Sequence, residues 1–341
     1  MRDAVALLWL GSFLTASLSA AACGDSDHQD PPAGDGSPVG QPDTGAGTGP
    51  DPAVCPVDTC EPVPLAADLQ DAVGIAVDDK RVYWADRTSG LIQGRSLDGG
   101  TKVEVAAGQG EPLGLAVADG RLYWANFGTG EIHRRELGGG LVAELAAGEL
   151  GPAYVAVDGE FVYWTSSTSG EVRRASLEGG APETLAKGQE LPVAIALDQD
   201  HVYWTTTTEV KRVAKSGGLV ESYAGVQPGP ESLAVDDAHV YWVDGIDQTV
   251  VRIAKEGGEV EVLATAQPTP EGITLGGGHV YWTNGGDGTI KRTPVAGGLI
   301  EEVAAGRTGL KEIAYRNGAV VWTETTTVAA VHLCGCDLAP P

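Results

Sequence analysis

The sequence predicts an all-β protein, a seven-bladed β-propeller whose blades are four-stranded antiparallel sheets. Three observations lead there: seven evenly spaced tryptophans, four short β-rich runs with turn residues in every repeat, and no helical periodicity. The tryptophans recur every 38 or 40 residues, at Trp84, Trp124, Trp164, Trp204, Trp242, Trp282 and Trp322. Because four strands of this length make one propeller blade, seven repeats predict seven blades around one axis.

Each repeat has the same internal order. An apolar run such as residues 74–78 precedes a turn, and a second run ends in the Tyr-Trp pair, as at residues 82–84. Third and fourth runs, for example residues 171–177 and 261–264, flank a Gly-Gly pair that suits a tight turn. A single blade cannot bury both of its faces, so we expect the Tyr-Trp pairs to fill the space between neighbouring sheets.

The seventh repeat contains only three of the four runs before the sequence ends. Residues 62–67, which precede the first repeat, match the missing fourth run, since Leu65-Ala66 aligns with Leu263-Ala264. We therefore expect the N-terminal strand to complete the last blade and to leave no open sheet edge.

Four cysteines fall at this predicted seam between the two ends of the propeller. Two lie on each side, and an oxidising compartment would favour disulfides between them. A bridge between the last two would be strained, so either of the two pairings that join the ends twice is favoured. The alternative is a four-cysteine zinc site, which the spacings do not support. These cysteines are Cys55, Cys60, Cys334 and Cys336.

The N-terminal segment reads as a secretion and tethering signal. Residues 1–22 contain an apolar run that is too short to span a bilayer, followed by small residues. The sequence Ala-Ala-Ala-Cys at 20–23 resembles the lipobox of bacterial lipoproteins, which implies lipidation of Cys23; the alternative is an ordinary secretory signal. Residues 23–54 then form the lipidated cysteine and a Gly/Pro/Asp-rich, disordered tether, 55–338 the propeller, and 339–341 a tail. We expect export across the inner membrane and a lipid-anchored place in the cell envelope, periplasmic or at the cell surface.

The formal net charge of −25 restricts the possible partners. Nucleic acid is excluded because phosphate contacts need clustered Lys and Arg, and anionic lipid headgroups are disfavoured for the same reason. We expect a monomer that contacts the membrane only through its anchor. A protein, peptide or saccharide partner, or a small cation, would suit this electrostatic field.

The recurring Tyr-Trp-Thr pattern, clearest at 163–165, 203–205 and 281–283, resembles the YWTD repeats of low-density-lipoprotein-receptor propellers. More broadly, the chain is similar to NHL-type and bacterial lyase-like propellers over residues 62–336. Receptor YWTD propellers have six blades, whereas this chain has seven tryptophan repeats. The resemblance implies the propeller fold and, by analogy, an extracytoplasmic binding role.

Two repeated columns of polar residues could be taken for binding sites. Histidines precede the Val-Tyr-Trp of three successive blades, which places them too far apart for one metal ion, and we expect solvated turn residues. The arginine column on the third strand is better explained by packing on a neighbouring tryptophan and pairing with an acidic residue. The members are His201, His239 and His279 in the first column, and Arg134, Arg174, Arg212, Arg252 and Arg292 in the second.

Residues that depart from the repeat are better candidates for a ligand site. The loops between the second and third strands and the starts of the inner strands gather around the channel on one face. Aromatic and charged residues that are unique to one blade fall at these positions. The candidates are Arg87, Phe127, Tyr154, Asp244, Asp287 and Glu312.

No serine elbow, zinc-binding HExxH or phosphate-binding loop occurs in the sequence. No catalytic residue, metal ligand or cofactor is therefore predicted, and the leading hypothesis is a non-enzymatic, membrane-tethered binding or protein-interaction scaffold. The alternative is a lactonase-like propeller hydrolase or lyase that uses carboxylates at the channel mouth, with Ca²⁺ as a candidate metal.

Overall fold

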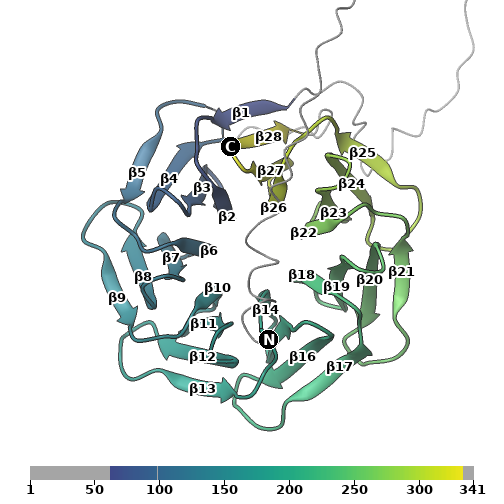
Figure 1. Ribbon diagram of the computed structural model, residues 1–341, viewed down its shortest axis with the longest axis horizontal. Coiled ribbons are helices and arrows are strands. Elements are labelled where there is room, and N and C mark those ends of the chain that lie inside the picture. The colour runs from purple at the N-terminus through teal and green to yellow at the C-terminus, as the bar shows by residue number, and fades with distance from the viewer. Residues whose placement is uncertain (1–61, 98, 333–341) are drawn as a thin grey trace, which may run out of the picture. The chain divides into compact units, whose positions relative to one another are not determined.

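A computed structural model describes residues 62–97 and 99–332 of the chain. They form seven four-stranded antiparallel sheets arranged around one axis (Figure 1). The predicted all-β, seven-bladed architecture is confirmed. None of the described residues belongs to a helix that is long and apolar enough to cross a membrane.

The strand nearest the axis opens each blade, and the second strand carries the Tyr-Trp pair. The innermost strands are β2 (Ala72–Val77), β6 (Pro112–Ala118), β10 (Pro152–Val157), β14 (Ile195–Leu197), β18 (Pro230–Val235), β22 (Pro270–Gly276) and β26 (Leu310–Arg316). The second strands are β3 (Arg81–Asp86), β7 (Arg121–Asn126), β11 (Phe161–Ser166), β15 (His201–Thr205), β19 (His239–Asp244), β23 (His279–Asn284) and β27 (Ala319–Glu324).

The two outer strands of each blade follow in chain order. The third strands are β4 (Leu91–Ser96), β8 (Glu131–Glu136), β12 (Glu171–Ser176), β16 (Glu209–Ala214), β20 (Thr249–Ala254), β24 (Thr289–Pro294) and β28 (Thr327–His332). The fourth strands are β5 (Val103–Ala106), β9 (Ala143–Ala146), β13 (Glu183–Ala186), β17 (Glu221–Val226), β21 (Glu261–Ala264) and β25 (Glu301–Ala304).

The outermost strand of the seventh sheet is β1 (Val63–Ala66), which pairs antiparallel with β28. Val63 lies opposite Ala330, and Ala66 lies opposite Val328. Segments from the two ends of the described chain therefore share one sheet. All five cysteines, and with them the predicted disulfides and the lipidation at Cys23, lie outside the described residues.

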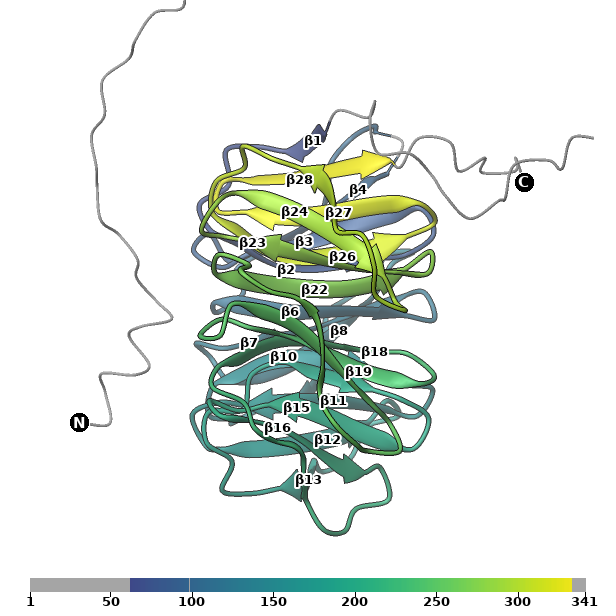
Figure 2. The ribbon, with the colours of Figure 1, turned by 90° about the vertical axis from the view of Figure 1, so that its right-hand side faces the viewer.

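The strands run across the thickness of the ring (Figure 2), so each strand end lies on one of two faces. We call mouth face the side where the inner strands begin and the loops join second to third strands. The hairpin face is the opposite side, with the turns that join first to second and third to fourth strands. The register fixes both, because Pro270 at the start of β22 pairs with Asn284 at the end of β23.

The Tyr-Trp pairs pack between blades, as predicted. All seven tryptophans of the repeats are completely buried. Tyr83 of the first blade shares a buried cluster with Trp124 of the second, and Tyr281 of the sixth shares one with Trp322 of the seventh. At the last interface Val321 takes the place of tyrosine and packs in the cluster of Trp84. The hydrophobic core is thus a ring of seven inter-blade clusters.

The threonine after Tyr-Trp connects neighbouring blades by hydrogen bonds. The Thr283 hydroxyl donates to the Lys311 carbonyl of the next blade at 2.7 Å, and it accepts the amide N–H of Gly272 in its own blade at 2.8 Å. Thr323 does the same between the seventh and first blades, through the carbonyl of Val73 and the amide of Glu312. The threonine of the repeat therefore aligns the start of one inner strand with the next.

Replacement of Thr283 by valine is expected to lower the free energy of unfolding by about 1–3 kcal/mol, because it leaves a buried carbonyl and a buried amide without a partner. Urea unfolding followed by tryptophan fluorescence measures the change. The matched control is Thr265→Val at an exposed position, which should change stability by less than about 0.5 kcal/mol. Equal stability of the two variants would show that the inter-blade bonds contribute nothing.

The repeated charged columns serve the blades themselves. The carboxylate of Asp78 accepts the amides of Lys80 and Arg81 and the hydroxyl of Tyr83, so it holds the turn between the first two strands. Arg174 donates to Glu183 in its own blade and to the carbonyl of Lys215 in the next, and Arg212 and Arg252 repeat both bonds. Arg292 donates to Glu301, and Arg134 donates to the carbonyl of Leu177. The acidic partner is confirmed for four of the five arginines, but the predicted tryptophan contact is wrong for two members. Arg174 lies over Phe161 and Arg212 over Tyr223, because the tryptophans are already enclosed between the sheets.

Candidate active site at the channel mouth

One repeat position near the start of each inner strand changes character around the ring. It is apolar in the first four blades and charged in the last three. Its members are Val73, Leu113, Ala153, Val193, Glu231, Glu271 and Lys311. Four of these residues accept a hydrogen bond on their backbone carbonyl from the threonine of the preceding blade, so they occupy equivalent positions in the ring. The mouth of the channel is therefore divided into an apolar arc and a charged arc.

Tyr154 on β10 and Glu312 on β26 meet across the axis. The tyrosine hydroxyl donates to Glu312 Oε1 at 2.7 Å. Burial raises the pKa of Tyr154 well above its usual value, and the negative charge of Glu312 adds to this effect. Burial also raises the pKa of Glu312, although the bond from Tyr154 opposes the rise. Both side chains are enclosed by protein yet keep part of their surface accessible to water.

Glu271 on β22 is the carboxyl group at the mouth whose pKa lies near neutrality. Burial raises its pKa to about 7, Lys311 lowers it, and the like charges of Glu231 and Glu312 raise it. Glu231 and Glu271 also raise the pKa of Tyr154, so the three carboxylates act on the same part of the channel. A glutamate with a pKa near neutrality can both accept and release a proton under physiological conditions.

Glycines at the mouth face leave room for these carboxylates. A Cβ atom on Gly285 would lie 2.3 Å from Glu271 Oε1, and one on Gly245 would lie 3.2 Å from Glu231 Oε1. Each glycine directly follows the second strand of its own blade. A larger residue at position 285 would displace Glu271, so the loop and the carboxylate fit each other.

Lys311 is held by a short chain of ion pairs. Its ammonium group pairs with the Asp71 carboxylate, and Arg87 Nη2 binds the other oxygen of Asp71 at 2.5 Å. Asp71 itself is buried. The predicted candidate Arg87 thus reaches the charged arc through Asp71 and fixes the cation beside the glutamates.

The other predicted site residues are engaged in their own loops. The buried Asp244 carboxylate accepts the backbone amides of Gly229, Ile246 and Asp247. Asp287 accepts the amide and the hydroxyl of Thr289. The structure therefore brings together Tyr154 and Glu312, with Arg87 joined to them through Asp71 and Lys311.

Phe127 lies in a mouth-face loop of the second blade and is half-buried. Its ring approaches Gly151, where a Cβ atom would lie 3.1 Å from Phe127 Cε2. It packs against the segment that leads into the third blade. No contact of the described residues joins it to the Tyr154–Glu312 pair.

Sequence reasoning missed Glu231, Glu271, Lys311 and Asp71. The signal was present, since an alignment of the inner strands shows the change from apolar to charged at one column. It was overlooked because the position next to it, with Gly74, Gly114 and Gly272, showed the clearer departures Tyr154 and Glu312.

The three histidines of the repeated turn lie on separate blades, and each ring is 5.8–6.1 Å from the tyrosine ring two residues later. Within the described ranges, no group of three or more His, Cys, Asp or Glu side chains is placed to hold a metal ion.

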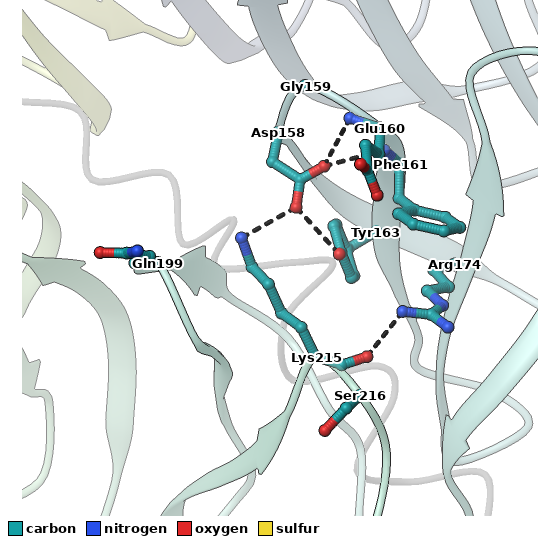
Figure 3. Close-up of a pocket in the computed structure, with 9 residues that line it drawn as sticks. All are labelled: Asp158, Gly159, Glu160, Phe161, Tyr163, Arg174, Gln199, Lys215 and Ser216. Atoms are coloured by element: carbon teal, nitrogen blue, oxygen red, sulfur yellow. Dashed lines mark hydrogen bonds and ion pairs between the residues drawn. The ribbon is translucent and has the colours of Figure 1, made fainter.

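A shallow, open depression lies on the hairpin face between the third and fourth blades (Figure 3). Asp158 accepts hydrogen bonds from Lys215 at 2.8 Å and from the Tyr163 hydroxyl at 2.9 Å. Arg174 donates to the Lys215 carbonyl at 2.6 Å. These charged groups are paired across the blade interface, so the depression reflects how two blades meet, and the channel mouth is the better candidate site.

Comparison with solved structures supports the fold. The chain is similar to virginiamycin B lyase from Staphylococcus aureus, with a TM-score of 0.71 and 19% identity over 81% of this chain and 99% of that one. A streptogramin B lyase gives a TM-score of 0.71 at 18% identity, with 81% of this chain and 97% of that one covered. A nidogen/laminin complex covers 61% of this chain and 87% of that one, with a TM-score of 0.51 and 21% identity. No family model and no curated protein matches the sequence. The chain thus has the seven-bladed fold that these lyases also have.

Proposed function

We propose that the protein is a lyase that opens a cyclic ester at the channel mouth by elimination. The observation that carries this proposal is Glu271, a carboxyl group with a pKa of about 7 beside Lys311 and the Tyr154–Glu312 pair. The similar structures support it, since two are named as lyases and a third is a catalytically inactive virginiamycin B lyase with quinupristin. This proposal replaces the scaffold hypothesis as the leading interpretation.

The charged arc supplies the groups that an elimination needs. Glu271 takes the proton from the carbon adjacent to the one that bears the ester oxygen, and the Lys311 ammonium stabilises the negative charge that develops on the oxygen of the carbonyl group attached to that carbon. The electron pair forms a carbon–carbon double bond as the bond to the ester oxygen breaks, and the leaving group departs as a carboxylate. Glu271 then releases its proton to water.

Tyr154 and the apolar arc have positioning roles in this proposal. The raised pKa keeps Tyr154 protonated, so it remains a hydrogen-bond donor at the centre of the channel. Leu113 and Val193, which are partly exposed at this position, offer an apolar surface to the body of the substrate. The acidic arc favours neutral or positively charged substrates over anions.

The test is the mass of the product. The purified protein is incubated with quinupristin and with a panel of cyclic esters, and the products are separated and weighed by mass spectrometry. Elimination gives a ring-opened isomer of unchanged mass with a new double bond, whereas hydrolysis adds one water. A product that contains added water would make the protein a hydrolase, and binding without turnover would return it to the scaffold class.

We also propose that Cys23 carries a lipid that holds the propeller at the cell envelope, on the lipobox-like sequence before it. Cys23→Ser is expected to move the protein from the membrane fraction to the soluble fraction after ultracentrifugation. Cys55→Ser, outside the lipobox, is the matched control and should stay in the membrane fraction. Unchanged membrane partitioning of Cys23→Ser would refute the anchor.

A further inference from the structure

Three strongly exposed leucines occupy the same turn in alternate blades. This turn joins the third to the fourth strand on the hairpin face. Leu141, Leu219 and Leu299 expose 93%, 89% and 74% of their surface. Each is followed by a β-branched residue that is 36–39% exposed, namely Val142, Val220 and Ile300. We call these three pairs the apolar tips. Single exposed apolar residues are common on protein surfaces, but these three repeat at one turn on one face, where one flat partner can contact all of them.

The turns hold the tips in a defined conformation. Gly139 and Gly140 precede Leu141 with φ values of 109° and 124°, a backbone conformation that residues other than glycine rarely adopt. Arg135 Nε donates to the Gly140 carbonyl at 3.0 Å. A pair of glycines with positive φ also precedes Leu219 and Leu299. Each leucine is therefore carried on a tight, glycine-dependent turn.

The tips are spread around the ring. They belong to the second, fourth and sixth blades. Going around the ring, each tip is therefore two or three blade positions from the next. In the first, third and fifth blades the position of the leucine is taken by Thr101, Ala181 and Glu259. Three points that surround the axis on one face can all be touched by a flat surface, whereas a small ligand reaches only one.

The chain enters the propeller on this same face. The fourth strands begin at the hairpin face, and β1 is the fourth strand of its sheet, with Val63 paired to Ala330 of β28. The segment between the proposed anchor at Cys23 and β1 is therefore attached on the side of the apolar tips. A lipid at Cys23 would keep the propeller at a high effective concentration beside the bilayer.

We propose that the three apolar tips insert into the interfacial region of a zwitterionic lipid bilayer and lay the hairpin face on the membrane. The net charge of −25 disfavours an anionic bilayer. In this orientation the mouth face points away from the membrane, and the charged arc is open to substrate. The choice of the bilayer as partner rests in part on the proposed anchor, but the insertion itself does not need it.

The experiment uses the chain from residue 23 onward with Cys23→Ser, so that neither a lipid nor the apolar run within residues 1–22 is present, and flotation with phosphatidylcholine vesicles. The parent chain is expected to float with the vesicles. The variant Leu141→Ser/Leu219→Ser/Leu299→Ser should bind the vesicles at least about tenfold more weakly than the parent, because the serines bury no apolar surface in the bilayer. The matched control Leu150→Ser/Ile246→Ser removes two exposed apolar residues, 61% and 68% exposed, from the mouth face and should bind like the parent. Vesicles that contain phosphatidylglycerol should bind the parent less.

The proposal is overturned if the parent does not float, or if the triple variant floats as well as the parent. It is also overturned if analytical ultracentrifugation without vesicles finds a dimer of the parent that the triple variant abolishes, because the tips would then cover a second copy of the chain. Since the flotation chain carries no lipid, its result is separate from the fractionation test of Cys23.

Discussion

Glu271→Gln is expected to lower the turnover of the cyclic ester about a hundredfold or more, since removing a general base typically costs 10²–10⁴ in rate. Glutamine has the same shape and still fits against Gly285, but it cannot accept the proton. The loss should therefore fall on kcat, with KM changed little. Steady-state kinetics on the substrate found by mass spectrometry measures both constants.

Glu111→Gln is the matched control. Glu111 is an exposed glutamate at the mouth face of the second blade, before the apolar position Leu113. Its replacement should leave kcat within about twofold of the parent, as expected for a surface change away from the reacting groups. If Glu271→Gln kept half of the parent activity, Glu271 could not be the base.

Trp282→Ala should lower the free energy of unfolding by about 3–5 kcal/mol, the usual cost of removing a large aromatic side chain from a core. Trp282 is completely buried and packs with Tyr241 of the preceding blade. Its indole N–H also donates to Gln267 Oε1 at 2.9 Å, so the substitution removes one of the two donors to that buried oxygen, the other being the Asn284 amide. Equilibrium urea unfolding followed by circular dichroism measures the loss.

Trp282→Phe separates packing from hydrogen bonding. It keeps most of the apolar volume and should cost clearly less than Trp282→Ala. A loss below about 1 kcal/mol for Trp282→Ala would contradict the view that the inter-blade clusters are the main source of stability.

The fold could be predicted because each blade repeats the same local requirements. Every blade needs one tryptophan buried between the sheets, as Trp282 is in the sixth blade. The spacing of these tryptophans therefore gives the number of blades. The role of Thr283 could not be predicted, since its two bonds depend on how closely one inner strand approaches the next. Such distances between blades have no signature in a single repeat.

The candidate site was predicted in part. Tyr154 and Glu312 stood out because they replace glycine in the repeat, and the structure joins them. Glu271 was overlooked, since its importance comes from burial and from the charges of Glu231 and Glu312, which lie on other blades. Asp244 looked equally suitable in the sequence, but its backbone partners are visible only in the folded loop.

The most direct test of the account is the dependence of kcat/KM on pH. A base must be deprotonated to work, so kcat/KM should rise with pH and level off above an inflection near the Glu271 pKa of about 7. Glu231→Gln removes a like charge that raises this pKa, so the inflection should move to lower pH. A profile that is flat or falls between pH 5 and 9, roughly the range around that inflection, would contradict the proposed role of the channel mouth, as would an inflection that Glu231→Gln leaves in place.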